Sequence, residues 1–118
     1  MNSSNFVFEN VSLFRAKDNV TDLSAAFIFL EKYSRNNLLS NTRICLHDFD
    51  DSDLHVMLIY HSIHHIVPIH RHPIKDEVLV VHSGACIYND YGSMPLPSNN
   101  PISTTCGPGS ILLISSKN

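Results

Sequence analysis

The sequence predicts a mainly β protein with one N-terminal helix, in the class of β-sandwiches and β-barrels. From Thr42 onward, short apolar segments follow one another at close spacing with turn residues between them. A helical apolar period occurs only near residues 21–35. The chain has 118 residues, 43% hydrophobic and 16% charged, which is the composition of a globular domain. We divide it into an N-terminal segment, 1–41, and a β domain, 42–118.

The N-terminal segment predicts a short edge strand and then the helix. Apolar residues alternate weakly over residues 6–13, which is typical of a short strand at the edge of a sheet. Residues 21–35 follow an i, i+3, i+4, i+7 pattern, with Thr21 or Asp22 placed to cap the helix. The apolar stripe, which we expect to pack against a sheet, consists of Leu23, Ala26, Phe27, Leu30 and Tyr33.

The β domain predicts several short strands separated by turns. We expect strands at 43–47, 54–61, from near Ile69, and at 78–81, 85–88 and 111–114. Turn residues occupy 83–84, 89–92 and 106–109, and residues 93–101 hold three prolines and predict an irregular loop.

Charge, cysteine content and hydropathy exclude several classes. The formal net charge is −3, so nothing favours nucleic acid as a partner. The three cysteines form no C-x-x-C pair, which argues against a disulfide framework or a zinc ribbon, and Cys45 and Cys86 are most simply buried apolar residues. No apolar run reaches the roughly 20 residues of a membrane helix, and the N-terminus does not resemble a signal peptide. We expect a cytoplasmic protein without membrane insertion.

Histidine is the conspicuous residue type. All eight histidines lie between residues 47 and 82. Such clustering more often marks a metal site or an acid–base site than a histidine-rich surface.

The most informative stretch is His70-Arg71-His72, followed by Glu77. Histidines at i and i+2 of a strand point to the same face, so both imidazoles can reach one ion. A turn of this length can bring the Glu77 carboxylate back beside them. Two nitrogen ligands and one carboxylate suit one divalent transition metal ion such as Zn, Fe, Mn or Ni. His70, His72 and Glu77 are therefore the expected metal ligands.

The spacing H-x-H-x4-E-x6-G, formed with Gly84, resembles the first signature motif of the cupin superfamily. Segments 43–47 (RICLH), 53–59 (DLHVMLI) and 67–77 (VPIHRHPIKDE) are similar, in this order, to those of WbuC-type cupin-fold metalloproteins. The similarity covers roughly residues 35–114. It implies a cupin jelly-roll barrel (a double-stranded β-helix) and a role in sugar-nucleotide or surface-polysaccharide (O-antigen or capsule) synthesis.

The chain departs from the cupin pattern at both ends. His64 stands where the first motif usually opens with Gly, and it either crowds the turn or adds a ligand. Residues 109–118 resemble the start of the second motif, with Ser115 in place of the usual Pro, and stop about two residues before its His.

Three explanations of the missing His remain open. Three protein ligands hold the ion, another histidine such as His55 or His61 substitutes, or the chain is truncated. A barrel that lacks its closing strands exposes a sheet edge, which favours a homodimer.

Substrate contacts are expected from Arg43 and His47. A guanidinium matches phosphate or carboxylate geometry, and Arg71 alternates with the metal-binding histidines and should face the other way. The resemblance places His47 in a segment that precedes the metal strands. Tyr60, Tyr88 and Tyr91 either act as acids, line a sugar pocket or pack in the core.

Three functional hypotheses follow from these residues. The first is a metal-dependent sugar-modifying enzyme, isomerase- or epimerase-like, that takes a sugar or sugar nucleotide. The second is a non-catalytic cupin that binds a sugar or a partner, and the third is a non-haem iron oxygenase-type cupin.

Overall fold

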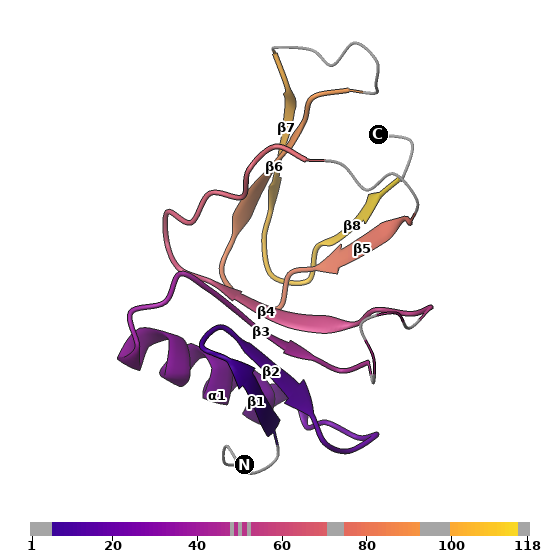
Figure 1. Cartoon of the computed structure of the whole chain (residues 1–118). Coiled ribbons are helices and arrows are strands. Elements are labelled where there is room, and N and C mark those ends of the chain that lie inside the picture. The colour runs from indigo at the N-terminus through magenta and orange to yellow at the C-terminus, as the bar shows by residue number, and fades with distance from the viewer. Residues whose placement is uncertain are drawn as a thin grey trace. The chain divides into compact units, whose positions relative to one another are not determined.

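The structure is a computed structural model, and it describes residues 6–47, 49, 51, 53–70, 75–92 and 100–115. Its internal contacts divide the chain into two units, Met1–Val67 and Pro68–Asn118, which are described separately below. The chain is mainly β with one helix, as the sequence predicts (Figure 1). In the described part of the chain, no helix has the length and apolarity needed to span a membrane.

The first unit is a four-stranded sheet with the helix α1 on one face (Figure 1). The sheet order is β1-β2-β3-β4, with β2 and β3 parallel and the other neighbours antiparallel. The edge strand expected near residues 6–13 is two strands: β1 lies at the edge with four of its five residues exposed, and a turn at 11–12 leads into β2. The elements are β1 (Phe6–Asn10), β2 (Leu13–Ala16), α1 (Leu23–Asn36), β3 (Asn41–Cys45) and β4 (Met57–His61).

Both ends of α1 are fixed by local chemistry. Asp22 is the N-cap, and its carboxylate accepts a hydrogen bond of 2.9 Å from the Ala25 backbone N–H. At the other end, Leu39 N–H donates to Ser34 C=O and Leu38 N–H donates to Arg35 C=O. This is the Schellman arrangement, in which the residue after the C-cap adopts a left-handed conformation. Here that residue is Leu38, with φ of 54°.

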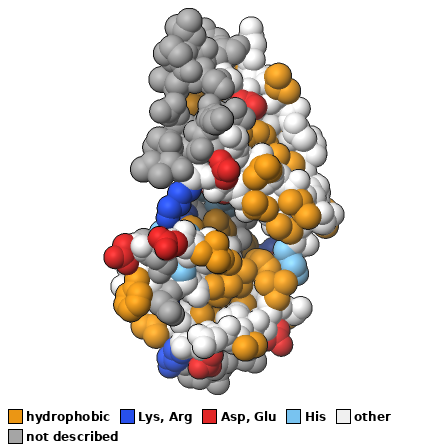
Figure 2. Space-filling model, turned by 90° about the vertical axis from the view of Figure 1, so that its right-hand side faces the viewer, with side chains coloured by type: hydrophobic (Ala, Val, Ile, Leu, Met, Phe, Trp, Pro, Cys, Tyr) orange, Lys and Arg blue, Asp and Glu red, His pale blue; other side chains and the backbone are white. Residues whose placement is uncertain are grey.

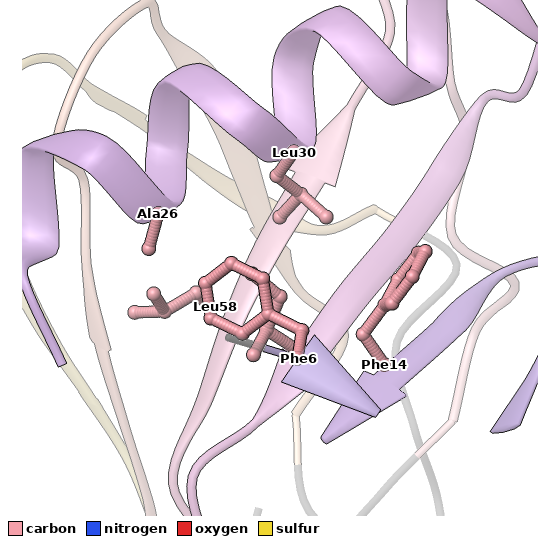
Figure 3. Packing of buried hydrophobic residues seen from close by; sticks show 6 residues of the cluster. Phe6, Phe14, Ala26, Leu30 and Leu58 are labelled. Atoms are coloured by element: carbon pink, nitrogen blue, oxygen red, sulfur yellow. The ribbon is translucent and has the colours of Figure 1, made fainter. Parts of the chain in front are cut away.

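The core of the first unit joins the helix stripe to the inner face of the sheet. Ala26 and Leu30 point from α1 toward the strands (Figure 3), as the stripe predicts. Phe27 and Tyr33 are partly buried, whereas Leu23 in the first turn is half exposed and was wrongly expected in the stripe. Each buried Leu, Ile or Phe contributes about 1.5–3 kcal/mol through transfer from water. The buried cluster is Phe6, Phe14, Ala26, Leu30, Ile44 and Leu58.

The second unit consists of two antiparallel ribbons that are nested in sequence. The first strand pairs with the last, and the two middle strands pair with each other. The strands are β5 (Glu77–Val80), β6 (Cys86–Asp90), β7 (Ile102–Cys106) and β8 (Ile111–Ile114). One face of the β5–β8 ribbon is aliphatic and exposed, and Figure 2 shows hydrophobic side chains gathered at the surface. That face carries Val78, Val80, Ile111 and Leu113, each more than 60% exposed.

Several sequence-based boundaries need correction. The expected strand near Ile69 is not present at residues 67–70, and the rest of that segment lies outside the described residues. Asn89 and Asp90, expected in a turn, belong to β6. The strand β7 was not predicted, because its sequence ISTTC is polar and lies between a proline-containing segment, most of which is outside the described residues, and a Gly-Pro-Gly turn. The four-stranded sheet includes β3 and β4, and the division of the chain after residue 41 stays a prediction.

Candidate functional site

The first expected metal ligand, His70, is exposed, and it precedes β5 in the chain. Its Nδ1 is 2.8 Å from the Pro68 carbonyl oxygen. A carbonyl oxygen can only accept, so Nδ1 carries the proton and the lone pair of the neutral ring is on Nε2. A backbone carbonyl that holds Nδ1–H is the usual support of a histidine that binds metal through Nε2.

Glu77 is the first residue of β5 and is half-buried opposite Ile114 of β8. The pKa of the Tyr88 phenol on β6 is raised first by burial, then by the Asp90 carboxylate and then by the Glu77 carboxylate. A phenol is protonated at neutral pH at its ordinary pKa and stays so when the pKa is raised, so the Tyr88 hydroxyl is available as a hydrogen-bond donor. Within the second unit, the structure thus relates the candidate carboxylate ligand to one of the tyrosines considered as acids.

The remaining ligand, His72, lies outside the described residues, as does Arg71. Among the residues that the structure describes, no three His, Cys, Asp or Glu side chains come together as a metal-holding group. His70, His72 and Glu77 therefore stay a prediction as a set of ligands, together with the ion that they would hold.

The two positions at which the cupin pattern has glycine, 64 and 84, both have a left-handed backbone conformation. Gly84, in the turn after β5, has φ of 74°, and nothing lies within 4 Å of the position of a Cβ. His64, where the cupin pattern has its opening glycine, has φ of 69°. The His65 N–H donates to Ser62 C=O over 3.1 Å, and His64 is the third residue of that turn. This is a type II turn, whose third position favours glycine.

The expected substrate residues Arg43 and His47 both belong to the first unit. Arg43 on β3 is half-buried, and its guanidinium lies 3.7 Å from Met57 Sδ and 3.5 Å from Asn41 Oδ1. His47 Nδ1 accepts from the Val56 N–H over 3.2 Å. These contacts place both side chains on the sheet of the first unit, and their role in binding a substrate stays a prediction.

Four histidines of the first unit form two ring pairs, one stacked and one tilted. The rings of His47 and His55 stack with centroids 4.2 Å apart, and those of His61 and His65 are tilted with centroids 4.5 Å apart. Burial, then the His65 ring and the Arg43 guanidinium, lower the pKa of His61. His55 precedes β4 and His61 ends it, so the two histidines do not share a strand face.

A shallow hollow of about 330 Å³ lies between the C-terminal end of α1 and β4. Its charged side chain is Arg35, which forms an ion pair of 2.9 Å with Glu31. Hydroxyl and leucine side chains make up most of the remaining wall, which includes Tyr60, one of the tyrosines considered as acids. Its lining residues are Ser34, Arg35, Leu38, Leu39, Ser40, Tyr60 and Ser62.

Cys86 corrects another expectation. It is exposed rather than buried, and it lies directly opposite the buried Cys106 across the β6–β7 ribbon. Both residues occur in the sequence, but only the strand register brings them together.

Comparison with family models, with curated proteins and with solved structures finds no match for this chain.

Proposed function

We propose that this chain is a small cupin-type metalloprotein that binds a sugar or sugar nucleotide in surface-polysaccharide synthesis. One divalent transition metal ion would be held by His70, His72 and Glu77. The observation that carries the proposal is the H-x-H-x4-E-x6-G spacing, with a left-handed backbone at both places where the cupin pattern has glycine, 64 and 84.

The topology of the second unit supports the same proposal. Pairing of the first strand with the last, and of the two middle strands with each other, is the nested arrangement found in jelly-roll folds. Glu77 begins the first of these strands and Gly84 follows it, as the motif requires. The completed barrel is part of the proposal.

The donor set fits the group that the motif implies. Imidazole suits Zn, Fe and Ni, and a carboxylate extends the range to Mn. The hydrogen bond from His70 Nδ1 to Pro68 leaves Nε2 as the nitrogen with the lone pair. When bound, such an ion polarises a carbonyl or hydroxyl group of a substrate.

Tyr88 supplies a group that an enzyme of this kind needs. The phenol is protonated at neutral pH and its raised pKa makes it a weaker acid, so its proposed role is to donate a hydrogen bond to a sugar oxygen. Arg43 and His47 are proposed to contact an anionic group of the substrate. Either an isomerase- or epimerase-like reaction or binding without turnover uses these residues.

The metal is tested on the purified full chain. The chain is stripped with a chelator, dialysed against Zn, Fe(II), Mn or Ni, and its bound metal is measured by elemental analysis. We expect one equivalent in the wild type, and at least a tenfold loss of affinity in His70→Ala and in Glu77→Gln. His82→Ala, an exposed histidine beyond β5, is the matched control and should bind like the wild type. Equal metal uptake by all four proteins would reject the site.

The ligand is tested by calorimetric titration of the metal-loaded and stripped chain with a panel of nucleotide sugars. Binding that weakens in Arg43→Ala supports the substrate assignment. Conversion of any bound sugar, followed by NMR, selects the enzyme over the binding protein, and oxygen uptake by the Fe(II) form selects the oxygenase. No binding of any panel member by either form would refute the sugar assignment.

A further inference from the structure

Two of the three cysteines form a facing pair in the second unit. Cys86 begins β6 and Cys106 ends β7, and the antiparallel register places them directly opposite each other. Directly opposed residues point to the same face of a ribbon, with Cα atoms about 4.5–5.5 Å apart. That interval lies within the range of roughly 4.4–6.8 Å that a disulfide spans.

Both cysteines are free thiols, and Cys106 is close enough to Cys86 to affect its titration. Burial, then the neighbouring Cys106 thiol, raises the pKa of Cys86, so its resting form at neutral pH is the thiol. Cys86 is exposed, whereas Cys106 is only 4% exposed. An oxidant from solution therefore meets Cys86 first.

We propose that Cys86 and Cys106 form a reversible disulfide by exchange with small-molecule disulfides. The Cys86 thiolate attacks a sulfur of the reagent, the S–S bond of the reagent breaks, and one small thiol leaves. The Cys106 thiolate then attacks the Cys86 sulfur of the mixed disulfide, and the second small thiol leaves. The protein loses two hydrogens, and one molecule of reagent is reduced to two thiols.

The bridge joins two connections of the second unit. Cys86 follows the turn of Gly84, between β5 and β6, and Cys106 precedes the Gly107–Gly109 turn, between β7 and β8. The disulfide would thus fix the end of the β6–β7 ribbon at which both connections to the β5–β8 ribbon begin. Cys45 belongs to β3 of the first unit, where its register partner is Met57.

The test treats the reduced full chain with glutathione disulfide and follows intact mass after an acid quench. We expect the wild type and the control Cys45→Ala to lose the mass of two hydrogens, with a peptide that links Cys86 to Cys106. Alkylation should fall from three thiols to one in the wild type, and dithiothreitol should restore all three. Circular dichroism verifies that each variant is folded.

The single variants separate the two steps. Cys106→Ala should stop at a stable glutathione adduct on Cys86, and Cys86→Ala should react at least tenfold more slowly because Cys106 is buried. A wild type that keeps glutathione on Cys86 while Cys106 is still alkylated would overturn the proposal. A disulfide that includes Cys45 would also overturn it. So would a native chain that stays unreactive while the urea-unfolded chain reacts.

Discussion

The turn at residues 62–65 offers a direct test of how the histidine motif is built. His64 occupies the left-handed region, with φ of 69°, at the third position of a type II turn. An L-residue in this region costs about 1–2 kcal/mol, and glycine does not. The His64 side chain is exposed, so its removal forfeits little buried surface. We therefore expect His64→Gly to stabilise the chain.

The net gain is smaller than the strain relieved. Glycine gives the unfolded chain more freedom, which costs about 0.4–1 kcal/mol. The difference leaves a stabilisation of roughly 0.5–1 kcal/mol. With a urea m-value of about 2 kcal/mol/M, this corresponds to an increase of roughly 0.4 M in the unfolding midpoint.

The assay is urea unfolding followed by circular dichroism, with chelator present so that no metal contributes to stability. His64→Ala is the control, because alanine retains the left-handed penalty and should not stabilise. Gly84→Ala gives the mirror experiment: a Cβ at that position meets nothing within 4 Å, so any destabilisation comes from its φ of 74°. Equal midpoints for His64→Gly and His64→Ala would refute the reasoning. Metal uptake by His64→Gly should match the wild type, and its loss would instead identify His64 as a ligand.

Two further predictions concern buried and titrating groups of the first unit. Ser34 and Thr42 are fully buried and hydrogen-bonded to each other, and Ser34 also donates to the Leu30 carbonyl over 2.6 Å. Ser34→Ala should destabilise the chain by about 1–3 kcal/mol because it removes the acceptor of the Thr42 hydroxyl. The double variant Ser34→Ala with Thr42→Val should recover most of this stability. Urea unfolding measures both. The lowered pKa of His61 means that the unfolded chain takes up its proton first as pH falls. Stability should therefore decline as pH drops below about 6.5 toward the folded pKa, and the decline should be shallower in His61→Gln. Thermal melts over this pH range measure the decline. Equal slopes for the wild type and His61→Gln would contradict the prediction.

The helix illustrates what the sequence is able to predict. Asp22 and the apolar stripe are local signals, and each acts within a few residues of where it occurs. The prediction of α1 is therefore accurate to within two residues. The last strand, β8, was predicted at its observed bounds because ILLI is a short apolar run after a turn.

Strand pairing and side-chain exposure depend on contacts between residues distant in sequence, which a local sequence pattern does not reveal. The polar strand β7 exists because it pairs with β6, and its own residues give little indication of a strand. Alternation along β6 separates two faces, but it does not say which face is covered, and Cys86 was therefore wrongly expected to be buried. For the candidate site, the sequence predicts the ligands from their spacing, and the structure adds the hydrogen bond of His70 to Pro68 and the influence of Glu77 on Tyr88.

The backbone at residue 64 keeps the left-handed conformation of the cupin pattern although the residue is not glycine. A left-handed residue that is not glycine persists only where the surrounding structure imposes it. At His64 the imposing elements are the end of β4 and the Ser62–His65 hydrogen bond, which turn the chain toward the segment that leads to His70. The turn thus keeps the conformation for which a glycine is suited, although the glycine itself is absent. If the histidine had been accommodated by a different turn, its φ would be negative and the agreement with the cupin pattern would rest on side-chain spacing alone.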